Sequence, residues 1–104
     1  IQDRTHVQKD GWEKNWKSDG EMSGTSGRAL RLEAIQIRLT GEAQDRYDVY
    51  YRVHCQRFGW LGWTKNGLEA GSAGYAYRLE AIQIQLVEKG GPAPGSTANA
   101  YYEK

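Results

Sequence analysis

Two pairs of tryptophans are the residues best suited to contact a ligand. Trp16 follows Trp12 closely, and Trp63 follows Trp60. An exposed indole is a flat surface on which a sugar ring can stack, whereas a buried indole supplies much of the core of a small β domain. We expect at least one tryptophan of each pair to lie in the core. Trp16 and Trp63 are the first candidates for exposed platforms, with Trp12 and Trp60 as further candidates.

Polar side chains recur near these tryptophans and could hydrogen-bond the hydroxyl groups of the same ligand. A histidine and a glutamine, two residues apart, precede the first tryptophan of each pair, and an Asp-Gly or Asn-Gly step follows the second. Residues two apart on a strand lie on one face, so each histidine would share a face with its glutamine. The candidates for polar contacts are His6, Gln8, His54, Gln56, Asp19 and Asn66.

The ionisable residues show no pattern typical of a metal site or an enzyme. Neither histidine has a second histidine or a cysteine at ligand spacing. Glu33 and Glu80 are equivalent residues of two similar segments, which gives them like environments, whereas a glycoside hydrolase needs two carboxyl groups in unlike environments. We expect no catalysis, no metal and no cofactor. We interpret Arg31 with Glu33, and Arg78 with Glu80, as structural braces in which the glutamate accepts backbone N–H groups.

A duplicated segment positions all of these residues. Residues 29–39 read ALRLEAIQIRL and residues 76–86 read AYRLEAIQIQL. The similarity extends back to the two histidines with one single-residue gap, which falls between the tryptophans of each pair. The chain is therefore one domain, 1–104, with repeat one at 1–41 and repeat two at 47–88.

Alternation of apolar residues predicts strands rather than helices. Within 29–39, Leu30 and Leu32 alternate in one register, and the apolar residues from Ile35 to Leu39 alternate in the other. A strand can change register in this way at a bulge, a bend or a change of sheet. Each repeat should hold about four short strands: one leading to the histidine, one around the second tryptophan and two from the duplicated segment.

Glycine and proline predict the connections between these strands. The Asp-Gly step at 19–20 and the Asn-Gly step at 66–67 indicate hairpin turns, and 24–27 and 71–74 indicate a second turn in each repeat. Residues 40–45 form a short charged loop, and 88–97 form a linker-like loop. Residues 100–104 are either the first strand of a third repeat or a strand that closes the sheet.

The combined motif resembles the ChW repeat, a family named for clostridial hydrophobic repeats with a characteristic tryptophan. The motif runs His-x-Gln-x-x-Gly-Trp, a second Trp, the spaced glycines and Arg-Leu-Glu-Ala-Ile-x-Ile-x-Leu, and both copies carry it. The resemblance implies a secreted or cell-surface protein of Gram-positive bacteria with tandem repeats. It also implies surface attachment or polymer binding rather than catalysis.

Composition narrows the choice of partners. A net charge of +1 argues against a nucleic-acid surface, and no apolar run approaches the roughly 20 residues that span a bilayer. Cys55 is the only cysteine, so we expect a buried strand residue and no internal disulfide. Because the chain begins at Ile1 without a signal-like segment, we expect a processed product or a piece of a longer protein.

The sequence thus predicts an all-β domain of two pseudo-symmetric repeats, packed as one small sandwich or barrel. Its expected function is non-catalytic binding of a cell-wall or other carbohydrate polymer outside the cell. The alternative, from a different class, is a protein-binding adhesion or scaffold module that acts through exposed aromatic residues and a free strand edge.

Overall fold

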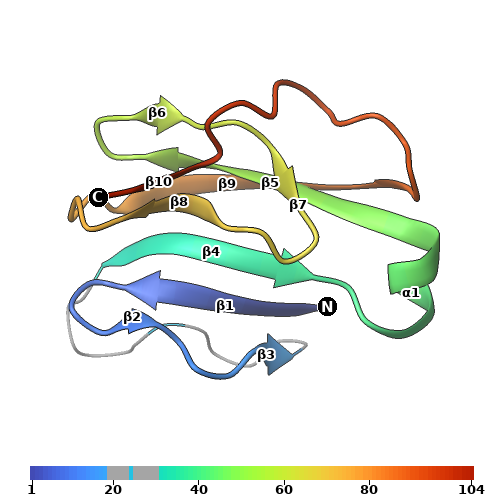
Figure 1. The fold of residues 1–104 in the computed structure, drawn as a ribbon, viewed down its shortest axis with the longest axis horizontal. Coiled ribbons are helices and arrows are strands. Elements are labelled where there is room, and N and C mark those ends of the chain that lie inside the picture. The colour runs from blue at the N-terminus through green and yellow to red at the C-terminus, as the bar shows by residue number, and fades with distance from the viewer. Residues whose placement is uncertain (19–23, 25–30) are drawn as a thin grey trace.

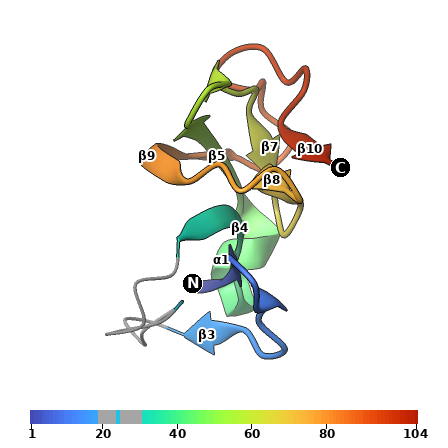
Figure 2. The same cartoon turned by 90° about the vertical axis from the view of Figure 1, so that its left-hand side faces the viewer.

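The duplicated segments become matching long strands in two sheets that pack against each other (Figure 1, Figure 2). A computed structural model describes residues 1–18, 24 and 31–104, so the predicted turn at 19–20 and most of that at 24–27 lie outside the described residues. The elements are β1 (Gln2–Val7), β2 (Gly11–Trp12), β3 (Lys17–Ser18), β4 (Leu32–Arg38), α1 (Gly41–Arg46), β5 (Tyr47–Cys55), β6 (Gly59–Trp60), β7 (Thr64–Lys65), β8 (Ala70–Ala73), β9 (Leu79–Glu88) and β10 (Tyr101–Glu103). The all-β prediction is confirmed.

Each repeat is built on one antiparallel pair, β1 with β4 and β5 with β9. Both pairs contain a bulge at the same place. His6 lies opposite Ala34 but Val7 lies opposite Leu32, which leaves the intervening glutamate as the extra residue. In repeat two His54 lies opposite Ala81 and Cys55 opposite Leu79. The change of register predicted from the apolar pattern is therefore a bulge, and the duplicated segment forms one strand rather than two.

Repeat two contributes one strand to the sheet of repeat one. The described part of the first sheet runs β10-β8-β4-β1-β2, with β3 also paired to β1, while β5 pairs with β6, β7 and β9 in the second sheet. The prediction of a turn at 71–74 is wrong, because Ala70–Ala73 is the buried strand β8. A Cβ on Gly71 would lie 2.5 Å from the Glu33 carbonyl oxygen, so this glycine permits close strand packing.

The predicted charged loop at 40–45 is also wrong, since this segment lies mostly within the short helix α1. Glu42 in its first turn and Arg46 in its last have the charges that favour a helix at those ends. α1 then leads directly into β5. In the part of the chain that the structure describes, no helix is both long enough and apolar enough to cross a membrane.

The core lies where β4 packs on β5. Its buried members, drawn from both repeats, are Ile37, Leu39, Val49, Tyr51, Val53, Cys55, Leu61 and Ala70. The expectation for Cys55 is confirmed: it is a fully buried strand residue, and burial raises the pKa of its thiol to about 11.

The C-terminal segment closes over repeat two and returns to the first sheet. Residues 89–100 contain no strand, and β10 then pairs in parallel with β8. The Tyr102 ring stacks on Phe58 with centroids 4.6 Å apart, and Tyr75 and Tyr77 contact the same Phe58 ring edge-on. This aromatic cluster holds β10 against repeat two.

Candidate ligand-binding grooves at the tryptophan pairs

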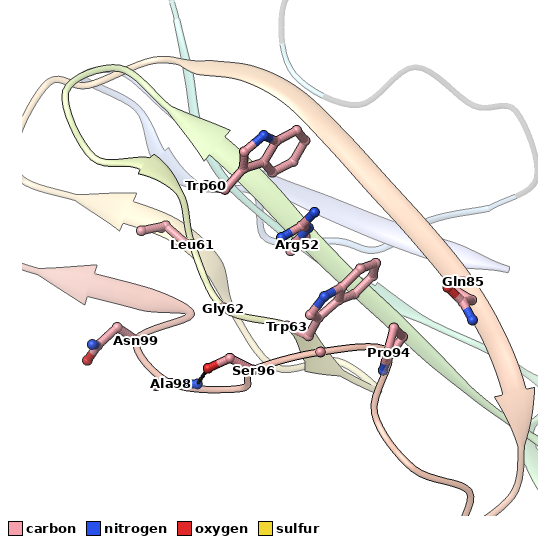
Figure 3. A pocket seen from close by; sticks show the side chains of 11 residues that line it. Arg52, Trp60, Leu61, Gly62, Trp63, Gln85, Pro94, Ser96, Ala98 and Asn99 are labelled. Atoms are coloured by element: carbon pink, nitrogen blue, oxygen red, sulfur yellow. Dashed lines mark hydrogen bonds between the residues drawn. The ribbon is translucent and has the colours of Figure 1, made fainter.

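An arginine lies between the two tryptophans of each repeat. In repeat two the Arg52 guanidinium carbon is 4.6 Å from the Trp60 ring centroid and 5.1 Å from that of Trp63 (Figure 3). A guanidinium over an aromatic face is attracted by the ring quadrupole. The three side chains therefore form a ladder across the outer face of the second sheet.

Repeat one builds the same ladder. The Arg4 guanidinium carbon is 5.7 Å from the Trp12 centroid and 5.2 Å from that of Trp16. Arg38 adds a further cation, 4.0 Å from the Trp16 centroid. The equivalent residue of repeat two is Gln85, which has no charge, so Trp63 lacks this second guanidinium.

Strand alternation and the long strand pairs hold the arginines in place. Arg52 and His54 share a face of β5, as Arg4 and His6 share a face of β1. The Arg52 Nε donates to Gln83 Oε1 at 2.6 Å, and Arg4 Nε donates to Gln36 in the same way. The arginines are thus oriented by hydrogen bonds as well as by the rings.

The histidines contact the bulge glutamates. His6 Nδ1 lies 3.0 Å from Glu33 Oε1, and His54 Nδ1 lies 3.1 Å from Glu80 Oε1. Each ring also meets the neighbouring tryptophan edge-on, with centroids 5.5 Å apart for His6 and Trp12. The glutamates were expected to accept backbone N–H groups; instead an imidazole lies at each of them, because His6 and His54 directly face the bulges.

The arginines of the predicted braces behave differently in the two repeats. Arg78 Nη2 is 3.3 Å from Glu80 Oε2, an ion pair on the surface. Arg31 Nη1 instead donates to the Ala76 carbonyl of repeat two at 3.2 Å. Arg31 therefore links the two repeats, while its counterpart Arg78 stays within its own.

The larger groove lies beside the Trp60 and Trp63 ladder and holds about 540 Å³. Its walls are Arg52, Trp60, Leu61, Gly62, Trp63, Gln85, Pro94, Gly95, Ser96, Ala98 and Asn99 (Figure 3). Trp60 is 43% exposed at the rim. The expectation that Trp63 would be an exposed platform is wrong: it is only 8% exposed, because the loop at 94–99 crosses it and the Ser96 carbonyl accepts its backbone N–H at 2.8 Å.

A second groove of about 380 Å³ lies beside Trp16. It is shared between the repeats, since Trp16 and Arg38 come from repeat one while Tyr47 and Gly67 come from repeat two. Lys89, just after repeat two, also lines it. Both Trp12 and Trp16 are half-buried. The two ladders are alike, but the grooves beside them differ because the loop at 94–99 lies over only one of them.

The remaining polar candidates are mostly engaged within the protein. Asn66 lines the Trp16 groove, but its side-chain amide donates to Asp48 Oδ1 at 2.8 Å and accepts from the Val49 N–H at 3.0 Å, so these groups are engaged within the protein. The Gln8 side-chain oxygen accepts from the Arg31 N–H at 3.4 Å. For Gln56 the bond is made by the backbone, whose N–H donates to the Arg78 carbonyl oxygen at 2.9 Å. Asp19 lies outside the described residues.

Hydrogen bonds also fix the charge of Asp48 below this turn. The Asn66 side chain, the Gly90 N–H and the Lys89 ammonium hold the pKa of the Asp48 carboxyl well below its usual range. Lys89 Nζ lies 3.0 Å from Asp48 Oδ1. Among the described residues, no group of three or more His, Cys, Asp or Glu side chains could hold a metal ion.

Sequence reasoning missed the arginines and the C-terminal loop. Arg4 and Arg52 occupy equivalent places in the lead-in strands of the two repeats, and this identity next to a pair of tryptophans was an available signal. The part that residues 94–99 play in the groove wall could not be found in this way, because repeat one has no corresponding segment for comparison.

Two sheets made from a bulged strand pair that occurs twice define a small all-β repeat protein. A model of the family described as clostridial hydrophobic W matches residues 6–41 and 54–88, and the chain belongs to this ChW family. No curated protein and no solved structure matches the chain.

Proposed function

We propose that this chain is a non-catalytic module that binds a carbohydrate polymer through the groove at Trp60. The observation that carries the proposal is the exposed Trp60 indole at the rim of a groove whose walls also carry Arg52, Gln85 and Asn99. The C–H face of a sugar ring can stack on an indole. The guanidinium and amide groups can donate to and accept from the sugar hydroxyls.

The lining of the groove favours binding over catalysis. All of its wall residues lie in the described chain, and none of them is an aspartate or a glutamate. Hydrolysis of a glycosidic bond generally needs two carboxyl groups on either side of the bond. The function we propose is therefore retention of the polymer, with no reaction and no cofactor.

The second tryptophan ladder supports a polymer as the ligand rather than a single sugar. Trp16 lines its own groove with Arg38 and Tyr47. Two weak sites on one rigid body gain affinity on a repeating chain, because the second contact is intramolecular. Cell-wall polysaccharide is the polymer that the ChW family resemblance favours. We therefore propose the cell surface or the outside of the cell as the place where the protein acts.

A protein-binding adhesion or scaffold module is the second candidate function. The observation that favours it is the exposed apolar row Ile82, Ile84 and Leu86 on β9. A free strand edge beside apolar side chains can accept an extended segment of another protein. This surface lies on the opposite face of the second sheet from Arg52 and Gln85, so the two candidates can be tested separately.

Sedimentation with insoluble cell wall and titration with soluble glycans would test the carbohydrate proposal. We expect the wild-type chain to bind and Trp60→Ala to lose about two- to tenfold in affinity, since one lost stacking contact is worth roughly 0.5–1.5 kcal/mol. Circular dichroism should show that Trp60→Ala stays folded, because this side chain lies at the groove rim.

Ile84→Ala is the matched control, because it removes an apolar side chain of similar exposure from the other face of the sheet. It should bind as the wild type does. Equal losses in both variants, or no binding of the wild-type chain to any polysaccharide, would contradict the proposal. Retention on a purified surface protein that Ile84→Ala abolishes and Trp60→Ala leaves intact would favour the second candidate.

A further inference from the structure

The two matching strands β4 and β9 differ sharply in how far they are covered. Ile37 is 3% exposed and Leu39 is 9% exposed, whereas their counterparts Ile84 and Leu86 are 52% and 54% exposed. β9 pairs only with β5 among the described strands, so its other edge is free. An apolar row beside a free strand edge is a surface that natural proteins cover or pair.

Among the described residues, the strands that cover the outer edge and the apolar face of β4 come from repeat two. Strand β8 pairs with the outer edge of β4, with Ala34 opposite Gly71 and Ile35 opposite Ala70. β5 packs on the apolar face of β4 and contributes to the shared core. The backbone N–H of Gly67 also donates to the Ile37 carbonyl at 2.7 Å.

Side chains fix the position of repeat two on repeat one. Arg31 of repeat one donates to the Ala76 carbonyl at 3.2 Å. The Gln36 amide donates to Glu69 Oε1 at 3.2 Å. Repeat one thus presents an arginine before the strand, a glutamine within it and an apolar row, and repeat two supplies the partners.

Repeat two presents the same set of groups at its own free edge. The equivalents of Arg31, Gln36 and Ile37 are Arg78, Gln83 and Ile84, and all three are exposed. We propose that the free edge of β9 is the docking site of a further ChW repeat, which would cover it as repeat two covers β4. The incoming repeat would pair its own Ala-Gly-Ser-Ala-type strand with β9 at Ala81.

The close packing of β8 at Gly71 shows what residue the docking strand of this partner must have. A Cβ on Gly71 would lie 2.5 Å from the Glu33 carbonyl oxygen and 2.8 Å from the Ala34 Cα. Any strand that pairs with β9 in the same way needs a glycine opposite Ala81. A second copy of this chain cannot supply β8 for this purpose, because both edges of β8 are already paired, with β4 and with β10.

A tandem chain tests the proposal. Residues 41–104 would be appended to Lys104 through a flexible Gly/Ser linker of about 20 residues, which spans roughly 25 Å. About half of the β9 amides point away from β5 in an antiparallel pair. We expect hydrogen exchange of residues 79–88 to slow at least about tenfold in the tandem chain relative to the 104-residue chain.

Two variants of the tandem chain test whether the protection comes from docking on β9 or only from attaching a repeat through the linker. Gly71→Leu in the appended copy blocks the close approach, and Ile84→Lys in the first copy alters only the apolar row of β9. Each should return exchange in residues 79–88 to the rate of the 104-residue chain. Unchanged exchange in the unmodified tandem chain, or protection that survives both variants, would overturn the proposal.

Sedimentation velocity of the 104-residue chain tests whether the free edge of β9 serves self-association instead. We expect a monomer across a concentration series, with β9 exchange independent of concentration. A dimer whose formation protects residues 79–88 would overturn the proposal, because the free edge would then serve self-association. The appended copy carries a Trp60 groove of its own, so this comparison needs Trp60→Ala in that copy. The groove of the first copy lies on the other face of the second sheet from the apolar row, so its polysaccharide binding should then match that of the 104-residue chain.

Discussion

The carboxylate of Asp48 accepts a hydrogen bond from the Asn66 side-chain amide at 2.8 Å, which ties the start of β5 to the turn after β7. The Gly90 N–H donates to the other carboxylate oxygen at 3.0 Å, so the same buried group also holds the segment after β9. Asp48 is 2% exposed. One side chain therefore joins two segments of repeat two and the segment that follows it.

Acid should weaken the fold through Asp48. Its folded pKa is depressed, so its contribution to stability is complete above the unfolded pKa of about 3.9 and is lost as the pH falls below that value toward the folded pKa. We expect Asp48→Asn to lower the free energy of unfolding by about 1–3 kcal/mol at pH 7. Urea titrations at pH 7, 5, 4 and 3 would measure the difference between variant and wild type. That difference should begin to shrink between pH 5 and 4 and shrink most between pH 4 and 3, and a constant difference would contradict the assignment.

Equivalent isoleucines should differ in their effect on stability. Ile37 lies in the core between the sheets, so Ile37→Ala should cost about 2–5 kcal/mol. Ile84 is exposed, so Ile84→Ala should cost less than about 1 kcal/mol. Denaturant unfolding would measure the free energy of unfolding of both variants, in which the replaced isoleucines have nearly the same neighbours in the sequence. Similar losses would mean that β9 is covered in solution by something that the single chain provides.

The repeats were predictable from the sequence because a duplicated apolar pattern specifies one strand pair twice. The change in register at Glu33 and Glu80 predicted a bulge, a bend or a change of sheet, and the structure has a bulge at each place. What each glutamate contacts was not predictable, because His6 and His54 are far from them in sequence. Trp63 was misplaced for a similar reason: the loop that buries it comes from residues 94–99.

The placement of β8 could not be predicted from its sequence. Ala-Gly-Ser-Ala followed by a glycine is typical of a turn, since glycine and serine favour turn conformations. In the fold the same small residues allow β8 to lie close against β4, which belongs to the other repeat. Local patterns specify the strand pair within each repeat, and the exchange of a strand between repeats depends on tertiary contacts.

Gly71 should be among the least replaceable residues in the chain. Its φ of +119° already favours glycine, and an added Cβ would meet backbone atoms of Glu33 and Ala34 that cannot move aside. Gly90 is a matched control, with a φ of +80° and no atom within 4 Å of an added Cβ. Gly90→Ala should cost about 1–2 kcal/mol for the left-handed backbone alone. Thermal unfolding should show a clearly larger loss for Gly71→Ala, and equal losses would mean that β8 is not held close to β4.

The Cys55 thiol should report on opening of the core. It is fully buried on β5, and its raised pKa of about 11 leaves very little thiolate at pH 8. A thiol reagent such as 5,5′-dithiobis(2-nitrobenzoic acid) should therefore react at least about 100-fold more slowly with the native chain than with the chain in 6–8 M urea. Below the unfolding midpoint the rate should rise with urea in step with the unfolded fraction, and Ile37→Ala should raise it while Ile84→Ala should not. Fast labelling of the native chain would contradict the packing of β4 on β5, because a reagent can reach Cys55 only if those two strands separate.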